Sequence, residues 1–145
     1  MESNQIIYIL FAIIFFGAWF LLLLVLSKVS GWQKLAISYA APEKFLGEKL
    51  RMQSIKMGRA HYQSSATLGT NSEVLYLSVL LPFHIGHPNL TIPYSDISGV
   101  EHKSLFWGHV EIRVAKASSV KIKLRKTQAD WLEANSNNVW KYDRA

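Results

Sequence analysis

Five histidines are the residues in this chain best suited to binding a metal ion, and four of them fall into two pairs. His84 and His87 are three residues apart, and His102 and His109 lie on either side of a predicted turn. A zinc site needs three or four ligands, each oriented by further hydrogen bonds. Because two histidines are too few, we predict no metal site and no cofactor, and we interpret these histidines as surface or turn residues.

A nucleophilic active site would need a serine or cysteine beside a base, together with donors for the developing oxyanion. The chain contains no cysteine, and no serine lies in a Gly-x-Ser-x-Gly sequence. Asp96 comes shortly after Pro93, where a carboxylate commonly stabilises a turn. We therefore predict no enzymatic activity and no catalytic residues, and keep an enzyme of unrecognised type as an alternative.

Two predicted loops, at residues 80–88 and 105–107, are unusually apolar. Loops usually carry polar residues, and large exposed apolar side chains mark contact surfaces. The first loop either folds over the mouth of the domain and covers its core, or contacts the membrane or a partner protein, and the second loop could join that contact. The candidate contact residues are Leu81, Phe83, Ile85, Phe106 and Trp107.

Positive charge is concentrated after residue 27: the chain has 16 Lys and Arg against 10 Asp and Glu, and only Glu2 comes earlier. Each basic residue near an anionic membrane gains about 1 kcal/mol, so proximity to lipid explains the charge and we expect no nucleic-acid partner. Lys121, Lys123 and Arg125 alternate along one predicted strand. They form either a solvated strand edge that discourages aggregation or a surface for anionic lipid or an acidic partner.

Residues 6–26 are 21 consecutive residues without charge or proline. As a helix they span about 32 Å, enough to cross the hydrocarbon core of a bilayer. The alternative is a cleaved secretory signal, with Ser30 and Gly31 in a weak cleavage site. Signals have a basic start and an apolar core of about 7–15 residues, whereas residues 1–5 lack Lys and Arg and this run is longer. We therefore predict an uncleaved transmembrane helix.

The orientation of this helix follows from the lysines that come after it. Lys28, Lys34 and Lys44 follow the span closely, and basic residues stay on the cytoplasmic side of a membrane. We therefore expect residues 1–5 outside and the remainder in the cytoplasm, at the inner (plasma) membrane of a bacterium. The absence of cysteine fits a reducing compartment.

Residues 27–46 are expected to form a juxtamembrane amphipathic helix and a linker. Ser30 can cap this helix, and Trp32 and Tyr39, seven residues apart, lie on one helical face. Two placements fit this face. Trp32 and Tyr39, together with Lys28, could anchor the helix at the membrane interface, or the same face could dock on the domain.

Residues 47–140 alternate between apolar and polar side chains, as half-buried antiparallel strands do. Thr127 can cap a C-terminal helix, and residues 141–145 form a tail. The clearest alternating sets, with polar residues between them, are Val110, Ile112 and Val114, and then Val120, Ile122 and Leu124.

One segment resembles the PH-like superfold, including bacterial PH-like and GRAM-like domains. A strand at residues 74–78 is followed by Ile92, Pro93, Tyr94, Ser95, Asp96 and Ile97, and then by Val100. The resemblance covers about residues 47–140. It implies an open barrel of bent sheets closed by a helix. The expected fold is one N-terminal transmembrane helix plus a mainly-β PH-like domain of about seven antiparallel strands and one C-terminal helix.

These features predict a membrane-anchored interaction or accessory module. The anchor would hold a cytoplasmic domain at the bilayer, where its local concentration near other membrane components is high. The expected partners are membrane lipids and another membrane protein, and the sequence does not indicate an oligomeric state. An anionic-lipid surface-binding module is the alternative, supported by the basic charge and the apolar loops.

Overall fold

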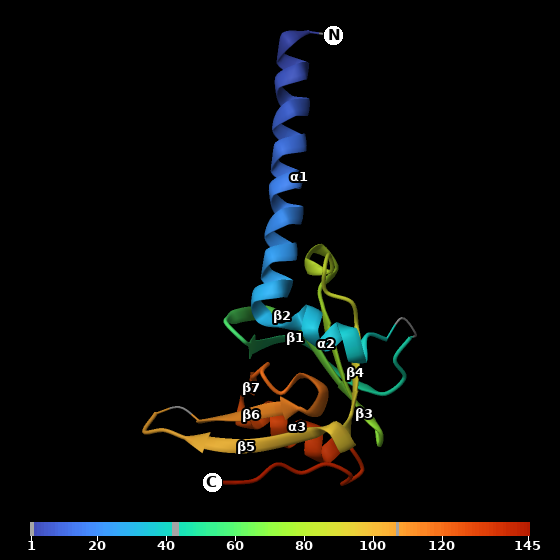
Figure 1. Ribbon diagram of the computed structural model, residues 1–145, viewed down its shortest axis with the longest axis vertical. Coiled ribbons are helices and arrows are strands. Elements are labelled where there is room, and N and C mark those ends of the chain that lie inside the picture. The colour runs from blue at the N-terminus through green and yellow to red at the C-terminus, as the bar shows by residue number, and fades with distance from the viewer. Residues whose placement is uncertain (1, 42–43, 107) are drawn as a thin grey trace.

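The computed structural model describes residues 2–41, 44–106 and 108–145, and three α-helices and seven β-strands are assigned within them. The helices are α1 (Ser3–Ser30), α2 (Trp32–Tyr39) and α3 (Lys126–Asn135), with 3-10 turns η1 (Leu81–Phe83), η2 (Tyr94–Asp96) and η3 (Ala115–Ala117). The strands are β1 (Glu48–Met57), β2 (Ala60–Thr70), β3 (Val74–Val79), β4 (Leu90–Pro93), β5 (Ile97–Lys103), β6 (Gly108–Val114) and β7 (Ile122–Leu124). Figure 1 shows α1 projecting from one end of a domain that contains the other elements.

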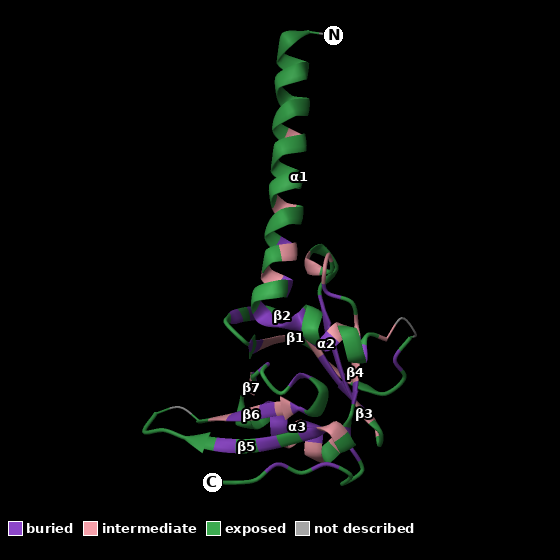
Figure 2. Cartoon of the chain, viewed as in Figure 1, coloured by how far each residue is buried: buried purple, intermediate pink, exposed green. Residues whose placement is uncertain are grey.

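Helix α1 is apolar and largely uncovered. Its 28 residues span about 42 Å, and most side chains before its last turns are exposed (Figure 2). By length and composition this helix could cross a membrane, a test that an N-terminal signal sequence also passes. It ends at Gly31, whose φ of 88° lies in the left-handed region that glycine adopts without steric penalty. Gly31 also precedes α2, so the chain turns there from one helix into the next.

The strands form one curled antiparallel sheet in the order β4-β3-β2-β1-β7-β6-β5. Strand β1 joins the two halves, because it pairs with β2 along its length and with β7 at Lys56 and Met57. Helix α3 follows the last strand and contacts β2 and β6. The predicted layout of one N-terminal apolar helix, seven antiparallel strands and one C-terminal helix is confirmed.

Two β-bulges bend the sheet where β1 and β2 pair. The register shifts on either side of Gln53, and Met52 and Ser64 have φ of 58° and 51°. Positive φ is uncommon for residues other than glycine, and a bulge increases the bend and twist of its strand. The N–H of Ser64 donates to Ser54 Oγ at 2.8 Å, which satisfies a backbone group that the bulge removes from the ladder. The alternation of the sequence gives no sign of these bulges.

The alternating apolar residues of β6 and β7 point into the core as expected, with Val110, Ile112, Ile122 and Leu124 at most 1% exposed. Strand β3 differs, because it is buried on both faces. Phe45 stacks on Tyr76, with the ring centroids 4.6 Å apart, and covers the face that alternation alone would leave in water.

Helix α3 begins earlier than the sequence suggested. Thr127 was the predicted cap, and this is wrong: the helix starts at Lys126, and Arg125 occupies the N-cap position. The backbone N–H of Arg125 donates to Gln128 Oε1 at 2.9 Å, so a glutamine three residues on closes the first turn. Gln128 Nε2 also donates to the carbonyl oxygen of Ser54 at 3.1 Å, which ties α3 to the bulged part of β1.

Both edges of the sheet are partly covered by the chain itself. Ala40, which follows α2, forms a bridge with Leu90 of β4. At the opposite edge, Asp143 exchanges backbone hydrogen bonds with Gly99 and Glu101 of β5, each of 2.8 Å. An uncovered edge would offer unpaired backbone groups to other chains, so these segments limit edge-to-edge association.

The strand register predicts unequal effects of one replacement at two positions. Ile112→Asn places an amide in the core, where residue 112 is fully buried, and should lower the free energy of unfolding by about 3–5 kcal/mol. Val100→Asn on the neighbouring strand, where the side chain is 43% exposed, should change it by less than about 0.5 kcal/mol. Thermal unfolding of the full chain in detergent, followed by circular dichroism, measures both. Equal losses would show that the buried face is wrongly assigned.

Candidate functional site

The end of α1 is built into the domain, and this joint is the first part of the candidate site. Leu23, Ser27 and Ser30 of α1 are at most 1% exposed. A Cβ on Gly31 would lie 2.6 Å from a methyl group of Val120, so only glycine fits there. A Cβ on Gly58, in the β1–β2 turn, would lie 2.5 Å from the carbonyl oxygen of Ser30. The helix is therefore held on two sides by close backbone approach.

A buried polar network fixes the joint from inside. The hydroxyl oxygen of Tyr62 lies 2.9 Å from Ser30 Oγ and 2.8 Å from His87 Nε2. His87 Nδ1 lies 2.8 Å from the carbonyl oxygen of Ile85. Because the Ile85 carbonyl oxygen can only accept, the neutral ring carries its proton on Nδ1, and its Nε2 can only accept. The Tyr62 hydroxyl has one proton, which it can donate to Ser30 Oγ or to His87 Nε2. Three segments far apart in the sequence thus meet at one hydrogen-bonded chain.

Burial shifts the titration of both aromatic members of the network. It raises the pKa of Tyr62 to about 12. It also lowers the pKa of His87, against the opposing effect of the hydrogen bond to Ile85. Tyr62 is 3% exposed and His87 is fully buried. A serine, a tyrosine and a histidine linked by hydrogen bonds could suggest a proton relay. Here all three side chains are buried, so a substrate in solution could not reach them. The arrangement therefore stabilises the joint.

Helix α2 packs on the domain. Trp32 and Tyr39 were expected either at the membrane interface or against the domain, and the second placement is the one found, with exposures of 0% and 4%. Trp32 Nε1 donates to the carbonyl oxygen of Pro88 at 2.8 Å, and the hydroxyl of Tyr39 donates to Asp96 Oδ2 at 2.8 Å. The prediction that Trp32 and Tyr39 anchor the helix at the membrane interface is therefore corrected, because both side chains pack on the domain. Of the three expected anchors only Lys28 is exposed.

The apolar loop at residues 80–88 lies alongside α1 (Figure 1). Trp19 of α1 donates from Nε1 to the carbonyl oxygen of Pro82 at 3.2 Å, and its ring centroid lies 5.6 Å from that of Phe83. A Cβ on Gly86 would lie 2.8 Å from Ser27 Oγ, so the loop backbone contacts α1 a second time. The loop therefore follows α1 back along its axis for about two turns.

The two apolar segments that the sequence grouped together lie in different parts of the domain. Leu81 is 87% exposed beside α1, while Phe83 and Ile85 are half-buried there. Phe106 is 80% exposed in the β5–β6 turn, which Figure 1 shows projecting sideways at the end of the domain away from α1. Trp107 lies outside the described residues. The segments therefore present separate surfaces.

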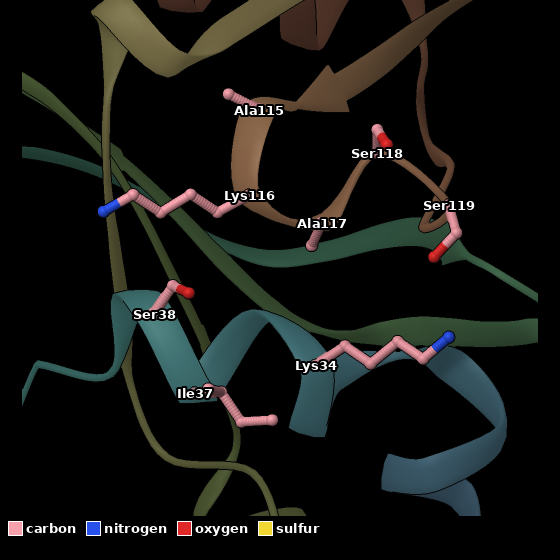
Figure 3. Close-up of a pocket in the computed structure, with 8 residues that line it drawn as sticks. All are labelled: Lys34, Ile37, Ser38, Ala115, Lys116, Ala117, Ser118 and Ser119. Carbon is pink, nitrogen blue, oxygen red and sulfur yellow. The ribbon is translucent and has the colours of Figure 1, made fainter.

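Basic side chains surround the joint. Lys28, Lys34 and Arg59 line an open groove of about 200 Å³ between the end of α1, the β1–β2 turn and the segment before β7. Lys34 also borders a neighbouring groove of about 330 Å³ between α2 and η3, with Lys116 on its other wall. Figure 3 shows the two ammonium groups directed toward opposite ends of this groove. Because the charges do not converge, the arrangement suits a broad anionic surface better than one small ligand.

The basic residues predicted on β7 divide between two settings. Lys123 and Arg125 line a groove of about 450 Å³ that also includes Lys56 and His109. Arg125 donates to Gln53 Oε1 at 3.1 Å, so its guanidinium is partly engaged within the domain. Burial, and after it the charge of Lys123, lowers the pKa of His109. Lys121 is exposed and is not among the residues that line this groove.

The histidines make different contacts in different parts of the domain. His84 lies 2.9 Å from Asn89 Oδ1, and the rings of His102 and His109 stack with centroids 5.2 Å apart. Among the described residues, no group of three or more His, Cys, Asp or Glu side chains is arranged to hold a metal ion.

The chain matches no protein-family model, no curated protein and no solved structure. The joint was missed by sequence reasoning, because Ser27, Tyr62 and His87 each look ordinary in their own segments. The available signal was the Ser30–Gly31 pair directly before an amphipathic helix, and we interpreted it as a cap instead.

The burial of His87 predicts an acid-sensitive domain. The unfolded chain binds a proton at this position below about pH 6.5, whereas the lowered pKa of His87 means that the folded chain binds it only at a lower pH. Neutral His87 therefore makes its full contribution to the free energy of unfolding above about pH 6.5. That contribution is lost as the pH falls toward the pKa of His87 in the folded chain. We expect the melting temperature of the full chain to fall between about pH 7.5 and pH 5.5.

The control separates His87 from His109, whose pKa is also lowered. His87→Gln should flatten the pH dependence of the melting temperature, whatever its effect on absolute stability. His109→Gln should retain most of that dependence, because His109 is much less buried. A wild-type slope retained in His87→Gln would contradict the assignment.

Proposed function

We propose that the protein is a membrane-anchored interaction module, in which α1 crosses the inner membrane of a bacterium and holds a PH-like domain at its cytoplasmic face. The anchor fixes the position of the domain relative to the membrane, and the domain recruits or stabilises another membrane protein. The observation that carries this proposal is the joint: Ser27 and Ser30 belong to the long apolar helix and are buried where it meets the domain.

The joint supports an anchor that is retained after synthesis. Cleavage near Gly31, as in a secretory signal, would separate α1 from the domain. Ser30 Oγ accepts a hydrogen bond from the N–H of Trp32 and lies beside the Tyr62 hydroxyl. Removing α1 with Ser30 would leave buried polar groups without hydrogen-bond partners. Each such group would lower the stability of the domain by about 1–3 kcal/mol. A helix that the domain needs for its own packing is suited to a permanent anchor.

The joint also supports a fixed orientation of the domain. A flexible linker would let the domain rotate freely, whereas here Gly31 alone separates two packed helices. Lys28, Lys34 and Arg59 gather where α1 enters the domain, and basic residues near a cytoplasmic surface are attracted to anionic lipid. With that side against the membrane, the β5–β6 turn is held away from it (Figure 1).

The exposed β5–β6 turn is our candidate for the partner contact. Leu105 and Phe106 are 89% and 80% exposed, and burying such a side chain gains about 1.5–3 kcal/mol. The turn connects two paired strands, so little freedom is lost when it binds. A partner with a cytoplasmic part would meet it there.

An anionic-lipid surface-binding module is the second candidate. It is favoured by the two basic grooves that Lys34 borders, one of which lies where α1 enters the domain. In this alternative the domain binds the anionic membrane surface directly and needs no protein partner. Replacing Lys34 and Arg59 with Gln would then weaken binding to anionic vesicles and leave partner recovery unchanged.

The proposed topology predicts the location of the C-terminus. A reporter protein that is active only in the cytoplasm, fused after Ala145, should be active in cells, because the basic residues follow the span and stay inside. A reporter that is active only outside the inner membrane should be silent at the same position. Activity of the second fusion and silence of the first would reverse the topology.

The partner contact predicts position-dependent crosslinking in the full membrane-bound chain. A photoreactive amino acid at Phe106 should crosslink to another membrane protein, which mass spectrometry identifies. The same group at Ile37, which is 85% exposed on α2, is the matched control and should not capture that protein. Replacing Leu105 and Phe106 together with Ser should reduce its co-purification at least about tenfold, the equivalent of about 1.4 kcal/mol.

These two replaced side chains lie at the surface, so the melting temperature should stay within a few degrees of that of the wild type. Undiminished recovery of the same partner from the double variant would reject this turn as the contact.

A further inference from the structure

We propose that the loop at residues 80–86 is inserted into the cytoplasmic leaflet of the membrane beside α1, where Leu81 and Phe83 contact lipid acyl chains. The domain would then hold the bilayer at two points, the spanning helix and this loop. The inference rests on the proposed function for the placement of α1 in a membrane and adds a second membrane contact to it.

The contact with Trp19 sets the depth of the loop. The indole of Trp19 donates to Pro82, and its ring lies against Phe83. Trp19 precedes the end of the charge-free run at Leu26 by seven residues, or about 10 Å along the helix. Side chains at the height of Trp19 are therefore below the headgroups if residues 6–26 cross the bilayer.

Shifting the helix in the membrane does not change this result. The charge of Glu2 keeps the hydrocarbon core from starting before residue 3. A core that needs about 20 helical residues then extends at least to residue 22, which is beyond Trp19. Every placement that keeps Glu2 in water therefore leaves Trp19, and the loop against it, at hydrocarbon depth.

The composition of the loop fits that environment. Residues 80–86 contain no Asp, Glu, Lys or Arg, and Leu81 is 87% exposed beside a helix whose own apolar side chains face outward. In water, this side chain would be left uncovered with no part of the domain to bury it. Acyl chains cover it without any second protein.

The backbone of the loop is also suited to a medium without water, where unpaired N–H groups are unfavourable. The N–H of Phe83 donates to the carbonyl oxygen of Leu80 at 2.9 Å, and the N–H of His84 donates to that of Leu81 at 3.1 Å. Pro82 has no N–H to satisfy, and its carbonyl oxygen accepts from Trp19. The turn η1 and the indole thus pair these polar groups within the chain.

Single-cysteine labelling tests the depth, because the chain has no cysteine of its own. Three full-length variants, Leu81→Cys, Phe16→Cys and Leu105→Cys, carry an environment-sensitive fluorophore in vesicles of phosphatidylcholine and phosphatidylglycerol. All three side chains are at least 66% exposed, so labelling need not disturb packing. Nitroxide-bearing lipids report contact with acyl chains, and aqueous iodide reports contact with water.

We expect the label at Leu81 to be quenched by nitroxides, most strongly by those near the headgroup end of the acyl chain. The label at Phe16 should be quenched most strongly by nitroxides near the bilayer centre, and the label at Leu105 by iodide only. Quenching at Phe16 together with iodide quenching at Leu81 overturns the inserted loop and leaves the anchor intact. A label at Leu81 protected from both quenchers means that a protein surface, such as a second copy of the chain, covers it, and this also overturns the proposal. No lipid quenching at Phe16 rejects the spanning helix and the inserted loop together.

Discussion

The structure depends on the way α1 ends inside the domain. A long apolar helix normally gives way to a polar linker, but here one side of the last turns of α1, at Leu23, Ser27 and Ser30, is buried and its polar groups are paired. Ser30 accepts from the N–H of Trp32 and pairs with Tyr62, and Tyr62 pairs with His87. Gly31 turns the chain where no larger residue fits. Buried polar groups destabilise a protein unless they are hydrogen-bonded. A change in the angle between α1 and the domain would break these hydrogen bonds, so the network fixes that angle.

The sequence predicted those parts of the fold whose signal is local and repeated. The charge-free run of residues 6–26 and the alternation through Val110 and Ile112 each repeat one period over many residues. The bulges at Met52 and Ser64 could not be predicted, because no Gly or Asn marks them. The start of α3 was misplaced because Thr127 is the better cap by type, while the side chain of Gln128 decided the actual position.

The candidate site was harder to predict because its residues come together only in the folded chain. The apolar face of Trp32 and Tyr39 fits a membrane surface and a protein core equally well, and only the position of the strands decides between them. The loop at residues 80–88 presented the same ambiguity. Its half-buried side is covered by Trp19, a residue 64 positions before Phe83 that sequence patterns place in a separate membrane segment.

Charged side chains are arranged differently where α1 enters the domain and near the C-terminus. The end that α1 enters carries Lys28, Lys34 and Arg59, whereas near the C-terminus Arg144 is paired with Asp130 and Glu133. A surface rich in unpaired basic groups is attracted to anionic lipid, and one whose charges are already paired is not.

In the proposed function, this difference in charge and the rigid joint would restrict which partners can bind. A pre-oriented domain loses less rotational freedom on binding than a domain on a flexible linker, which strengthens a contact made in the right geometry. In the proposed arrangement, the same rigidity would exclude partners that cannot meet the β5–β6 turn, which lies at the end of the domain away from α1 (Figure 1). Under the proposed topology, a transmembrane partner without a cytoplasmic part would not reach Leu105 and Phe106. In that proposed role, the joint would select partners by the position of their binding surface as well as by its chemistry.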